Sequence, residues 1–459
     1  MEPIQVASKL RRQLAAERVE LERLNAYYDG SQPLAYLHPD LLAELDNRVK
    51  QLVINWPRLV VDAVEERLDV EGFRVGADID DTVWNWWQAN NLDEESQMAH
   101  TDALVMRRAY TCVGVAEATP GMPLITVESP LQVITKQDPR TRQVVAAVKS
   151  YWDEDTDVEH TALYLPDATY HYRGGINGMV EDRNLRDEHG RGVVPITPLI
   201  TRPRTLNKAG VSELADVVPL SDAANKIATD MMVAAEFHAI PRLVALGITE
   251  DDFVDEDGRP VSKWEKIAGR IWATPALPSE ADVKQLPSAD LRNFHDTINS
   301  LARLCAALSA LPPHFFGWSD SNPASADGIT AATMRLVKRV ERRQRSYGGA
   351  WESTLRKAYQ WLDVPLPDGA TRIETVWRDA ATPSWSQSAD ALTKFAAGLG
   401  VPQEALWERI PTVSTTEVGR WKEMKAADRD ANANASAAAF GILGPDPLPE
   451  PVAEPVAGQ

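Results

Sequence analysis

The sequence predicts an α+β fold that is mainly helical and carries one antiparallel β region. Between residues 323 and 361, apolar side chains recur at steps of four and seven, which keeps them on one face of a long helix. Between residues 131 and 180 the apolar period changes to two, which predicts an antiparallel meander. With 459 residues, the chain is long enough for more than one packed region. The stripe of the long helix contains Leu336, Val340, Tyr347, Trp351 and Leu355.

Composition and charge exclude several classes of protein. The net charge of −19, from 48 basic and 67 acidic residues, argues against a protein that coats duplex DNA with its general surface. The two cysteines, Cys112 and Cys305, are too few for a disulfide framework, so we expect a reducing compartment. No run of about 18 apolar residues and no signal-peptide pattern occurs, so we expect a soluble protein, neither exported nor membrane-spanning.

The N-terminal region is predicted to be helical before the meander begins. A first helix ends at Asp29-Gly30, and a second begins at Asn55-Trp56-Pro57, where the proline sits near the first turn and forfeits no hydrogen bond. Residues 111–116 are expected to form a strand. A short helix carries three tryptophans that we assign to the core rather than to a ligand platform. They are Trp84, Trp86 and Trp87.

A glycine cluster at residues 174–178 could be mistaken for a phosphate-binding loop. Dinucleotide-binding and P-loop motifs are followed by a helix, whereas strand-like residues follow this cluster. We therefore interpret the cluster as a turn within the meander.

Two helices that flank a small mixed insert are predicted after the meander. The first runs from residue 211 to about 239, with Pro219 kinking or restarting it and Pro241 ending it. Ser288 caps the second, which covers residues 289–310. The pattern is that of a helical hairpin with a small head.

The loop that leads into the long helix is apolar where a solvated turn would be polar. The helix carries a basic face in an acidic chain, which favours either an anionic partner or a solvated surface. Beyond it we expect a strand at 372–377, helices between 386 and 430, and a disordered tail. The loop comprises Leu311, Pro312, Pro313, His314, Phe315, Phe316, Gly317 and Trp318, and the basic face comprises Arg335, Lys338, Arg339, Arg342, Arg343 and Arg345.

Signatures of enzymes and metal sites fail in this sequence. The histidines never fall at His-Glu-x-x-His spacing, and no Gly-x-Ser-x-Gly nucleophile motif is present. The acidic run 252–258 suggests a calcium loop, but alignment on Gly258 places Phe253 at the first ligand position and Trp264 where a glutamate belongs. We therefore predict no catalytic residue, no metal and no cofactor.

Several short motifs follow one another in a specific order and spacing. They are Tyr27-Tyr28-Asp29-Gly30, Asn55-Trp56-Pro57-Arg58-Leu59, Leu68-Asp69-Val70-Glu71-Gly72-Phe73-Arg74, Asn91-Leu92-Asp93, Gly210-Val211-Ser212-Glu213-Leu214, Pro219-Leu220-Ser221-Asp222, Ala239-Ile240-Pro241-Arg242 and Val376-Trp377-Arg378-Asp379. Through these motifs the chain resembles the portal protein, or head-to-tail connector, of long-tailed bacteriophages. The resemblance covers most of the chain, up to about residue 430.

The resemblance implies a homo-oligomeric ring, commonly a dodecamer, at one capsid vertex, through which DNA is packaged and ejected. It implies docking of the terminase large subunit and of a head-tail adaptor, contacts with major capsid and scaffolding proteins, and assembly in the host cytoplasm. It implies a structural protein without catalysis. The expected parts are a wing (1–210), a first stem helix (211–240), a clip (241–288), a second stem helix (289–310), a tunnel loop (311–325), the long helix with a return to the wing (326–384), a crown (385–430) and a disordered tail (431–459).

The resemblance also suggests roles for three groups of residues. The apolar loop would face DNA in the channel, and the basic helix face would meet an acidic surface of the adjacent subunit, DNA or solvent. An alternative function is a nucleic-acid-binding or processing protein that grips its ligand with residues 335–345. The clip would dock its partners through Lys263, Trp264, Glu265 and Lys266.

Overall fold

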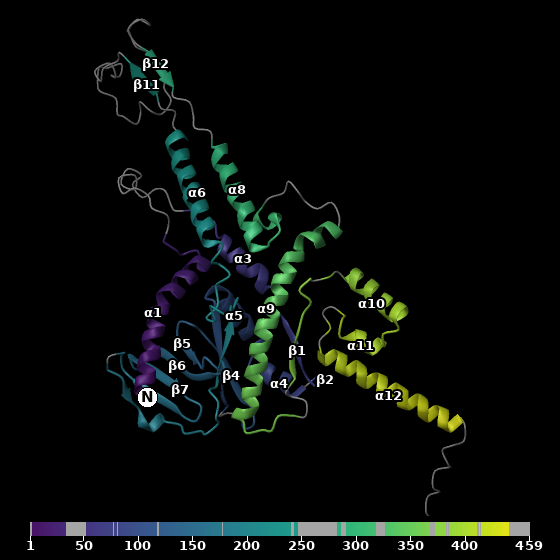
Figure 1. The fold of residues 1–459 in the computed structure, drawn as a ribbon. Coiled ribbons are helices and arrows are strands. Elements are labelled where there is room, and N and C mark those ends of the chain that lie inside the picture. The colour runs from purple at the N-terminus through teal and green to yellow at the C-terminus, as the bar shows by residue number, and fades with distance from the viewer. Residues whose placement is uncertain are drawn as a thin grey trace, which may run out of the picture. The chain divides into compact units, whose positions relative to one another are not determined.

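The computed structural model divides into two compact units, one formed by residues 1–68 and 90–365 and the other by residues 69–89 and 366–459. Figure 1 traces the chain. No helix within the described ranges is long and apolar enough to cross a bilayer. Those ranges are residues 2–33, 52–76, 78–79, 81–116, 119–176, 178–239, 243–246, 282–285, 291–317, 326–367, 372–381, 383, 385–410, 413 and 415–439.

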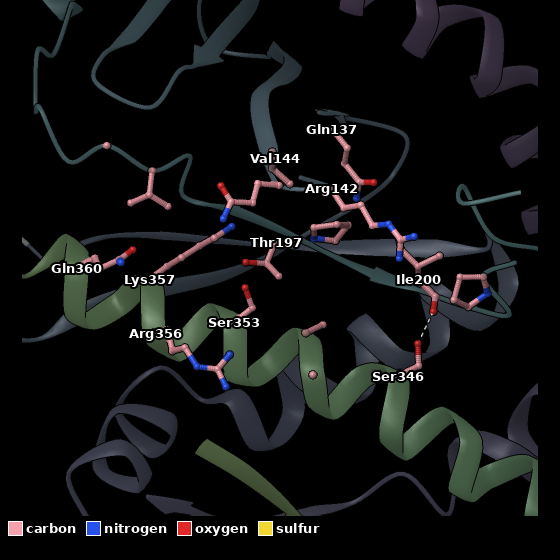
Figure 2. Close-up of a pocket in the computed structure, with 17 residues that line it drawn as sticks. Gln137, Arg142, Val144, Thr197, Ile200, Ser346, Ser353, Arg356, Lys357 and Gln360 are labelled. Atoms are coloured by element: carbon pink, nitrogen blue, oxygen red, sulfur yellow. Dashed lines mark hydrogen bonds between the residues drawn. The ribbon is translucent and has the colours of Figure 1, made fainter. Parts of the chain in front are cut away.

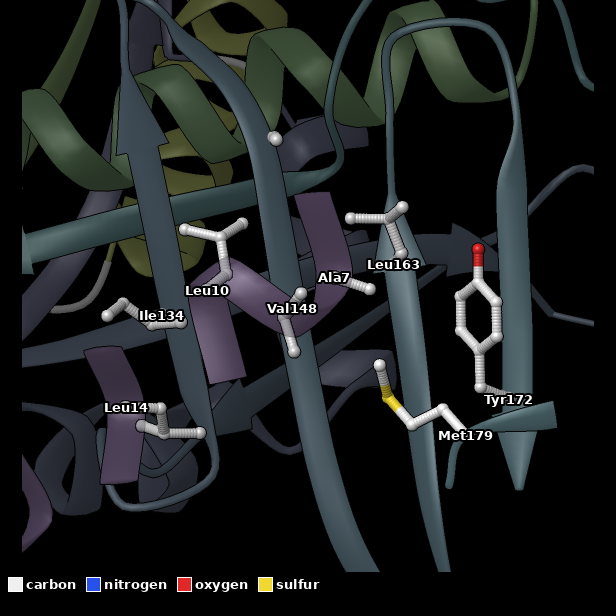
Figure 3. Close-up of a cluster of buried hydrophobic side chains, with 9 residues drawn as sticks. Ala7, Leu10, Leu14, Ile134, Val148, Leu163, Tyr172 and Met179 are labelled. Carbon is white, nitrogen blue, oxygen red and sulfur yellow. The ribbon is translucent and has the colours of Figure 1, made fainter. Parts of the chain in front are cut away.

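The first unit contains a five-stranded sheet covered by the N-terminal helix α1 (Pro3–Asp29). The strands follow one another in the order β5-β6-β7-β8-β9, each antiparallel to the next, so the predicted meander is confirmed. Ala7, Leu10 and Leu14 of α1 pack on Val148 and Leu163 of the sheet (Figure 3). The strands are β5 (Val133–Gln137), β6 (Val144–Asp153), β7 (Val158–Tyr164), β8 (Thr169–Arg173) and β9 (Val180–Glu181), followed by the short 3-10 turn η1 (Arg183–Leu185).

A second sheet of three strands was only partly predicted. Its order is β10-β3-β4, with β3 (Arg108–Val115) in the centre, β4 (Pro123–Glu128) on one side and β10 (Ile196–Ile200) on the other. Helices α5 (Leu92–Val105) and α9 pack on it. The sequence predicted β3 with a later start, and it missed β4 and β10.

Two helices in the first unit run side by side and form the predicted hairpin (Figure 1). They are α6 (Val218–Ala239) and α8 (Arg292–Ser309), and between them β11 (Leu243–Leu246) pairs antiparallel with β12 (Asp282–Gln285). The predicted start of the first helix at residue 211 is wrong, because the chain forms turns up to residue 217. Pro219 then lies in the first turn of α6, where a missing N–H costs nothing.

Helix α9 (Ala326–Trp361) is the longest described element, and its prediction is confirmed. The stripe read from the sequence is the buried face of this helix: its members are all at most 1% exposed. It contacts β3, β4, β10 and α3 (Trp56–Glu65), so it joins the second sheet to α3.

The second unit contains a small sheet and four helices in the described residues. Its sheet has the order β13-β1-β2, formed by β13 (Ile373–Trp377), β1 (Val70–Val75) and β2 (Asp78–Ile79). Trp87 of α4 (Asp81–Ala89) is fully buried and packs against Phe73, with ring centroids 5.2 Å apart, as expected of a core tryptophan. The remaining helices are α10 (Trp385–Leu399), α11 (Gln403–Trp407) and α12 (Thr415–Ala439).

The predicted boundary of the disordered tail at residue 431 falls inside α12, which continues to Ala439. The segment after residue 430 is rich in alanine, which has the highest helix propensity, so α12 can extend without packing partners. The rest of the predicted tail lies outside the described residues.

Candidate functional site

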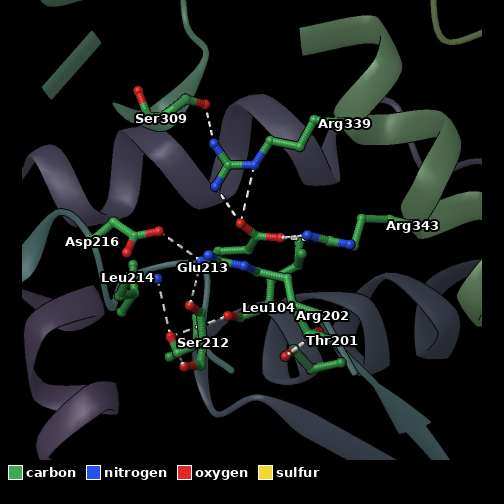
Figure 4. A network of polar contacts seen from close by, with 12 residues as sticks. Leu104, Thr201, Arg202, Ser212, Glu213, Leu214, Asp216, Ser309, Arg339 and Arg343 are labelled. Carbon is green, nitrogen blue, oxygen red and sulfur yellow. Dashed lines mark hydrogen bonds and ion pairs between the residues drawn. The ribbon is translucent and has the colours of Figure 1, made fainter. Parts of the chain in front are cut away.

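The turn before α6, the end of α8 and the middle of α9 meet at one buried carboxylate, that of Glu213. Its side chain has no exposed surface. Arg343 Nε donates to Glu213 Oε1 at 2.5 Å, and Arg339 Nε donates to Oε2 at 3.0 Å (Figure 4). Two guanidinium groups therefore share one carboxylate, and the cluster keeps one positive charge.

The backbone that carries Glu213 is fixed to the end of α5. The Glu213 N–H donates to the carbonyl of Leu104 at 2.9 Å, and Ser212 Oγ donates to the carbonyl of Val105 at 2.6 Å. Gly210 begins this turn with φ +83°, and a Cβ there would lie 2.5 Å from the carbonyl oxygen of Thr201. The conformation and the lack of space both require glycine.

Arg339 also binds the end of α8. One of its guanidinium nitrogens donates to the carbonyl of Ser309, the last residue of that helix. The final carbonyls of a helix have no partner within it and carry partial negative charge, so an arginine stabilises them. Ala310 follows in the left-handed conformation, with φ 60°. A single side chain of α9 thus connects the end of α8 to Glu213.

The charge state of Glu213 follows from these contacts. Burial by itself would raise the pKa of the Glu213 carboxyl, but the charges and hydrogen bonds of Arg339 and Arg343 outweigh burial and hold the pKa below its ordinary value. Glu213 is therefore ionised at neutral pH.

The predicted basic face does not lie on one surface of α9, which corrects the sequence interpretation for two residues. Arg339 and Arg343 turn inward to Glu213, with 14% and 10% of their side chains exposed. Lys338 and Arg345 both pair with Glu341 on the same helix. Some of the basic residues lie next to the apolar stripe around the helix axis. Sequence spacing alone therefore does not distinguish arginines that point inward from those that point outward.

Five of the six basic residues, all except Arg345, line an open pocket of about 1010 Å³ that also includes Glu213. Arg335 donates to the carbonyl of Ala307 in α8 at 3.3 Å, while Arg342 is exposed. Arg202 pairs with Asp216 at 2.9 Å on another wall. Cations outnumber carboxylates in the lining, so the pocket suits an anionic group. The cations are Arg202, Arg204, Arg335, Lys338, Arg339, Arg342 and Arg343, and the carboxylates are Glu213 and Asp216.

The described part of the apolar loop packs partly within its own chain. Residues Pro313–Phe316 form the 3-10 turn η3, which contacts α8. Leu311 is buried, and the Phe316 ring meets Trp56 of α3 edge-on, with centroids 5.8 Å apart. Phe315 and Phe316 are half-buried, which is less exposure than the sequence suggested. The role of this loop in a channel stays a prediction, and Trp318 lies outside the described residues.

Further along α9, buried polar contacts hold the helix to the α5 side of the core. Trp351 Nε1 donates to His100 Nε2 at 3.0 Å, and the His100 ring stacks on Tyr347, with centroids 5.2 Å apart. Burial lowers the pKa of His100 to about 3, so the ring is neutral at physiological pH. The Thr354 and Thr111 hydroxyls share a hydrogen bond of 2.6 Å.

The four predicted clip residues, Lys263, Trp264, Glu265 and Lys266, lie outside the described residues. So does the rejected calcium-like run at 252–258. In the part of the chain that the structure describes, no group of three or more His, Cys, Asp or Glu side chains is placed to hold a metal ion.

The sequence alone does not identify Glu213 as a site residue, although Glu213 lies within the motif Gly210-Val211-Ser212-Glu213-Leu214. The available signal was a lone acidic residue between Val211 and Leu214, in a stretch too apolar for a solvated carboxylate. Such a residue predicts a buried partner of opposite charge. The identity of that partner depends on a contact with a segment more than a hundred residues away.

Comparisons with known proteins agree on one family. A family model described as "Phage portal protein, SPP1 Gp6-like" matches residues 7–431. The portal protein of Mycobacterium phage D29 is 36% identical over 391 residues, which cover 82% of this chain and 79% of that protein. The portal protein of Mycobacterium phage L5 is 34% identical over 439 residues, which cover 89% of each.

Solved structures with a similar trace include those of gene transfer agent particles. A chain from the neck of an empty particle has a TM-score of 0.47 and 15% identity, covering 83% of this chain and 96% of that one. A chain from the native virion also has a TM-score of 0.47 and 15% identity, covering 85% and 99%.

Proposed function

Because the chain belongs to the SPP1 Gp6-like family of phage portal proteins, we propose that its copies close into a dodecameric ring at one capsid vertex, the channel through which DNA is packaged and ejected. The protein is a structural head-to-tail connector of a bacteriophage and not an enzyme. The observation that carries the proposal is the family match, which extends from the first helix into α12.

The arrangement of the first unit supports assigning different roles to different segments of each subunit. Helices α6 and α8 are the proposed stem, and the insert between them, whose ends pair as β11 and β12, is the proposed clip. We assign docking of the terminase large subunit and of the head-tail adaptor to the clip. Major capsid and scaffolding proteins would contact the ring during assembly in the host cytoplasm.

The Glu213 cluster would fix the base of the stem to α9 in each subunit. Arg339 holds both the last carbonyl of α8 and the carboxylate that precedes α6. Force applied to the stem while DNA moves would then pass into α9 and the sheet beneath it. All of these contacts lie within one chain, so each subunit brings its own joint to the ring.

The charge of the chain supports a channel that releases DNA. Each phosphate neutralised by a channel wall adds a salt-dependent attraction that would hold the strand in place. A net charge of −19 per copy opposes such holding. The alternative of a nucleic-acid-binding protein that grips with residues 335–345 loses support, because Arg339 and Arg343 are already occupied by Glu213.

Mass and shape in solution test the proposal. A ring predicts a species of roughly twelve times the 50.7 kDa chain mass, with an axial opening in negative-stain class averages. A small oligomer without an opening, with affinity for duplex DNA that falls steeply as salt is added, would contradict the proposal and favour the alternative.

A further inference from the structure

A pocket of about 650 Å³ lies between the C-terminal half of α9 and β10, and its charged residues are all basic. Arg142, Arg356 and Lys357 line it, and none of its lining residues is acidic. The chain as a whole has 67 acidic residues against 48 basic ones, so a lining with only positive charges departs from the average surface. Figure 2 shows the pocket from close by.

A buried hydroxyl in this lining lacks a hydrogen-bond partner. Thr197 of β10 is 4% exposed, and its Oγ1 makes no hydrogen bond to any group in the described part of the chain. Leaving a buried hydroxyl unpaired costs about 1–3 kcal/mol. In Figure 2 the Thr197 side chain points toward Ser353 and Lys357 of α9. A ligand that accepts a hydrogen bond there would remove this cost.

The ammonium group of Lys357 has unused hydrogen-bonding capacity. Its Nζ donates to the carbonyl of Ile196 at 2.6 Å, which occupies one of three N–H donors. Burial lowers the pKa of Lys357 to about 8, although the neighbouring Cys112 acts in the opposite direction. Burial also raises the pKa of the Cys112 thiol to about 12, so at neutral pH that thiol is uncharged. No carboxylate in the pocket lining compensates the lysine.

We propose that this pocket binds an oxyanion, a carboxylate or a phosphate, through the Lys357 ammonium and the hydroxyl groups of Thr197 and Ser353. A cation beside two hydroxyl donors matches an oxygen anion, which accepts several hydrogen bonds at once. Arg142 at the pocket wall adds attraction at longer range, whereas Arg356 already pairs with Glu352 at 3.5 Å. Neutral ligands would leave the lysine uncompensated.

The occupant has two possible sources. One is a carboxylate side chain of a second copy of this chain, since Asp and Glu are in excess on every copy. The other is free phosphate. The proposal that the pocket binds an oxyanion depends only on contacts within one chain. The proposal that a second copy supplies the carboxylate depends also on the proposed ring.

Competitive labelling of lysines with acetic anhydride, read by peptide mass spectrometry, tests the site in the full-length chain. The unassembled protein is labelled at about pH 8, near the Lys357 pKa, in inorganic phosphate or in chloride of equal ionic strength. We expect phosphate to slow labelling of Lys357 severalfold, while the exposed Lys394 of α10 reports general reactivity. Thr197→Val should abolish the protection by phosphate without loss of stability, because it removes an unpaired hydroxyl.

Matched variants and the assembled protein complete the test. Thr161→Val, another buried threonine on a strand, should leave the protection intact, and Ser353→Ala should weaken it. Protection that appears on assembly without phosphate and disappears in Thr197→Val identifies a carboxylate of the second copy. The proposal is overturned if neither phosphate nor assembly gives protection that depends on Thr197. The mass of each sample is measured in parallel, so a failure to form rings is seen separately.

Discussion

Glu213 and Arg343 form an ion pair that is hidden from solvent, with Arg343 Nε donating to Glu213 Oε1 at 2.5 Å. The carboxylate comes from the turn before α6 and the guanidinium from the middle of α9. Removing one partner of a buried pair leaves the other charge uncompensated, which costs far more than breaking an exposed pair.

We predict that Glu213→Gln lowers the free energy of unfolding by about 3–5 kcal/mol. Glu341→Gln is the matched control, because Glu341 pairs with Lys338 and Arg345, whose side chains are 66% and 76% exposed. Its cost should be at most about 1 kcal/mol. Urea unfolding of the unassembled chain gives both free energies. Equal losses in the two variants would show that the buried Glu213 ion pairs contribute no more to stability than the exposed pairs of Glu341.

Replacement of Gly210 by alanine should be strongly destabilising. The added Cβ would meet the carbonyl oxygens of Thr201 and Arg107 at 2.5 and 2.9 Å, at a positive φ that alanine rarely adopts. We expect a loss of more than about 2 kcal/mol. Gly349→Ala within α9 meets nothing within 4 Å and should stabilise by about 0.5–1 kcal/mol. Thermal unfolding of the two variants should therefore shift in opposite directions.

The free energy of unfolding should depend on pH because the buried His100 has a lowered pKa. Its pKa is about 3 in the folded chain against an ordinary value of 6.5, so only the unfolded chain binds this proton between those values. The stability that neutral His100 contributes is complete above pH 6.5 and is lost as the pH falls, by up to about 1.4 kcal/mol per pH unit.

Comparison with His100→Gln isolates this effect. Asp102, on the same helix, works in the opposite sense, because burial raises its carboxyl pKa to about 6 and the folded chain binds that proton first. Wild type should exceed His100→Gln in stability at pH 7.5, and the gap should narrow at pH 5.5 and again at pH 4.5. A constant gap in denaturant titrations would mean that His100 does not titrate as described.

The two phenylalanines of the loop should separate folding from DNA passage. Phe316 packs edge-on against Trp56, so Phe316→Ser should lower stability, by roughly 2–4 kcal/mol. Phe315 contacts the neighbouring His314, so Phe315→Ser should change stability less. We expect Phe315→Ser rings to assemble but to fill capsids with DNA poorly in a packaging assay. Normal filling of capsids by the Phe315→Ser rings would contradict the prediction that this loop faces the channel.

Alanine replacement of the four predicted clip residues should weaken docking. Tryptophan is enriched among the residues that dominate the energetics of protein interfaces, and the charged residues beside it can add polar contacts. The variant combines Lys263→Ala, Trp264→Ala, Glu265→Ala and Lys266→Ala. The control is Lys208→Ala, at an exposed residue of the predicted wing. Affinity for the terminase large subunit and for the adaptor is measured on assembled rings, and undiminished binding would locate docking elsewhere.

Local patterns in the sequence predicted the elements whose burial repeats along the chain. The period of two placed the five-stranded meander, and the spacing from Leu336 to Leu355 placed the buried face of α9. Both signals arise because neighbouring turns or alternate strand residues share one environment. The missed strands β4 and β10 flank β3, and their partners are fixed by tertiary pairing more than by pattern.

The candidate site was predictable only in its parts. Arg339 and Arg343 were singled out as basic, and Glu213 belonged to a recognised motif, but their contact joins segments more than a hundred residues apart. Arg339 and Arg343, which were expected at the surface, are instead largely buried and both pair with Glu213. Sequence periodicity does not reveal such a contact, because it depends on how the turn before α6 approaches α9 in the folded chain.

The pairing of Leu246 with Asp282 has a consequence for how such proteins diversify. The chain leaves and re-enters the helical hairpin at adjacent points, so the span between those residues can lengthen, shorten or be exchanged while its two ends stay together. The entropic cost of a longer closed span grows only slowly with length. If this segment is the clip that we propose, its exchange alone would change the docking partner of the ring while α6 and α8 stay unchanged.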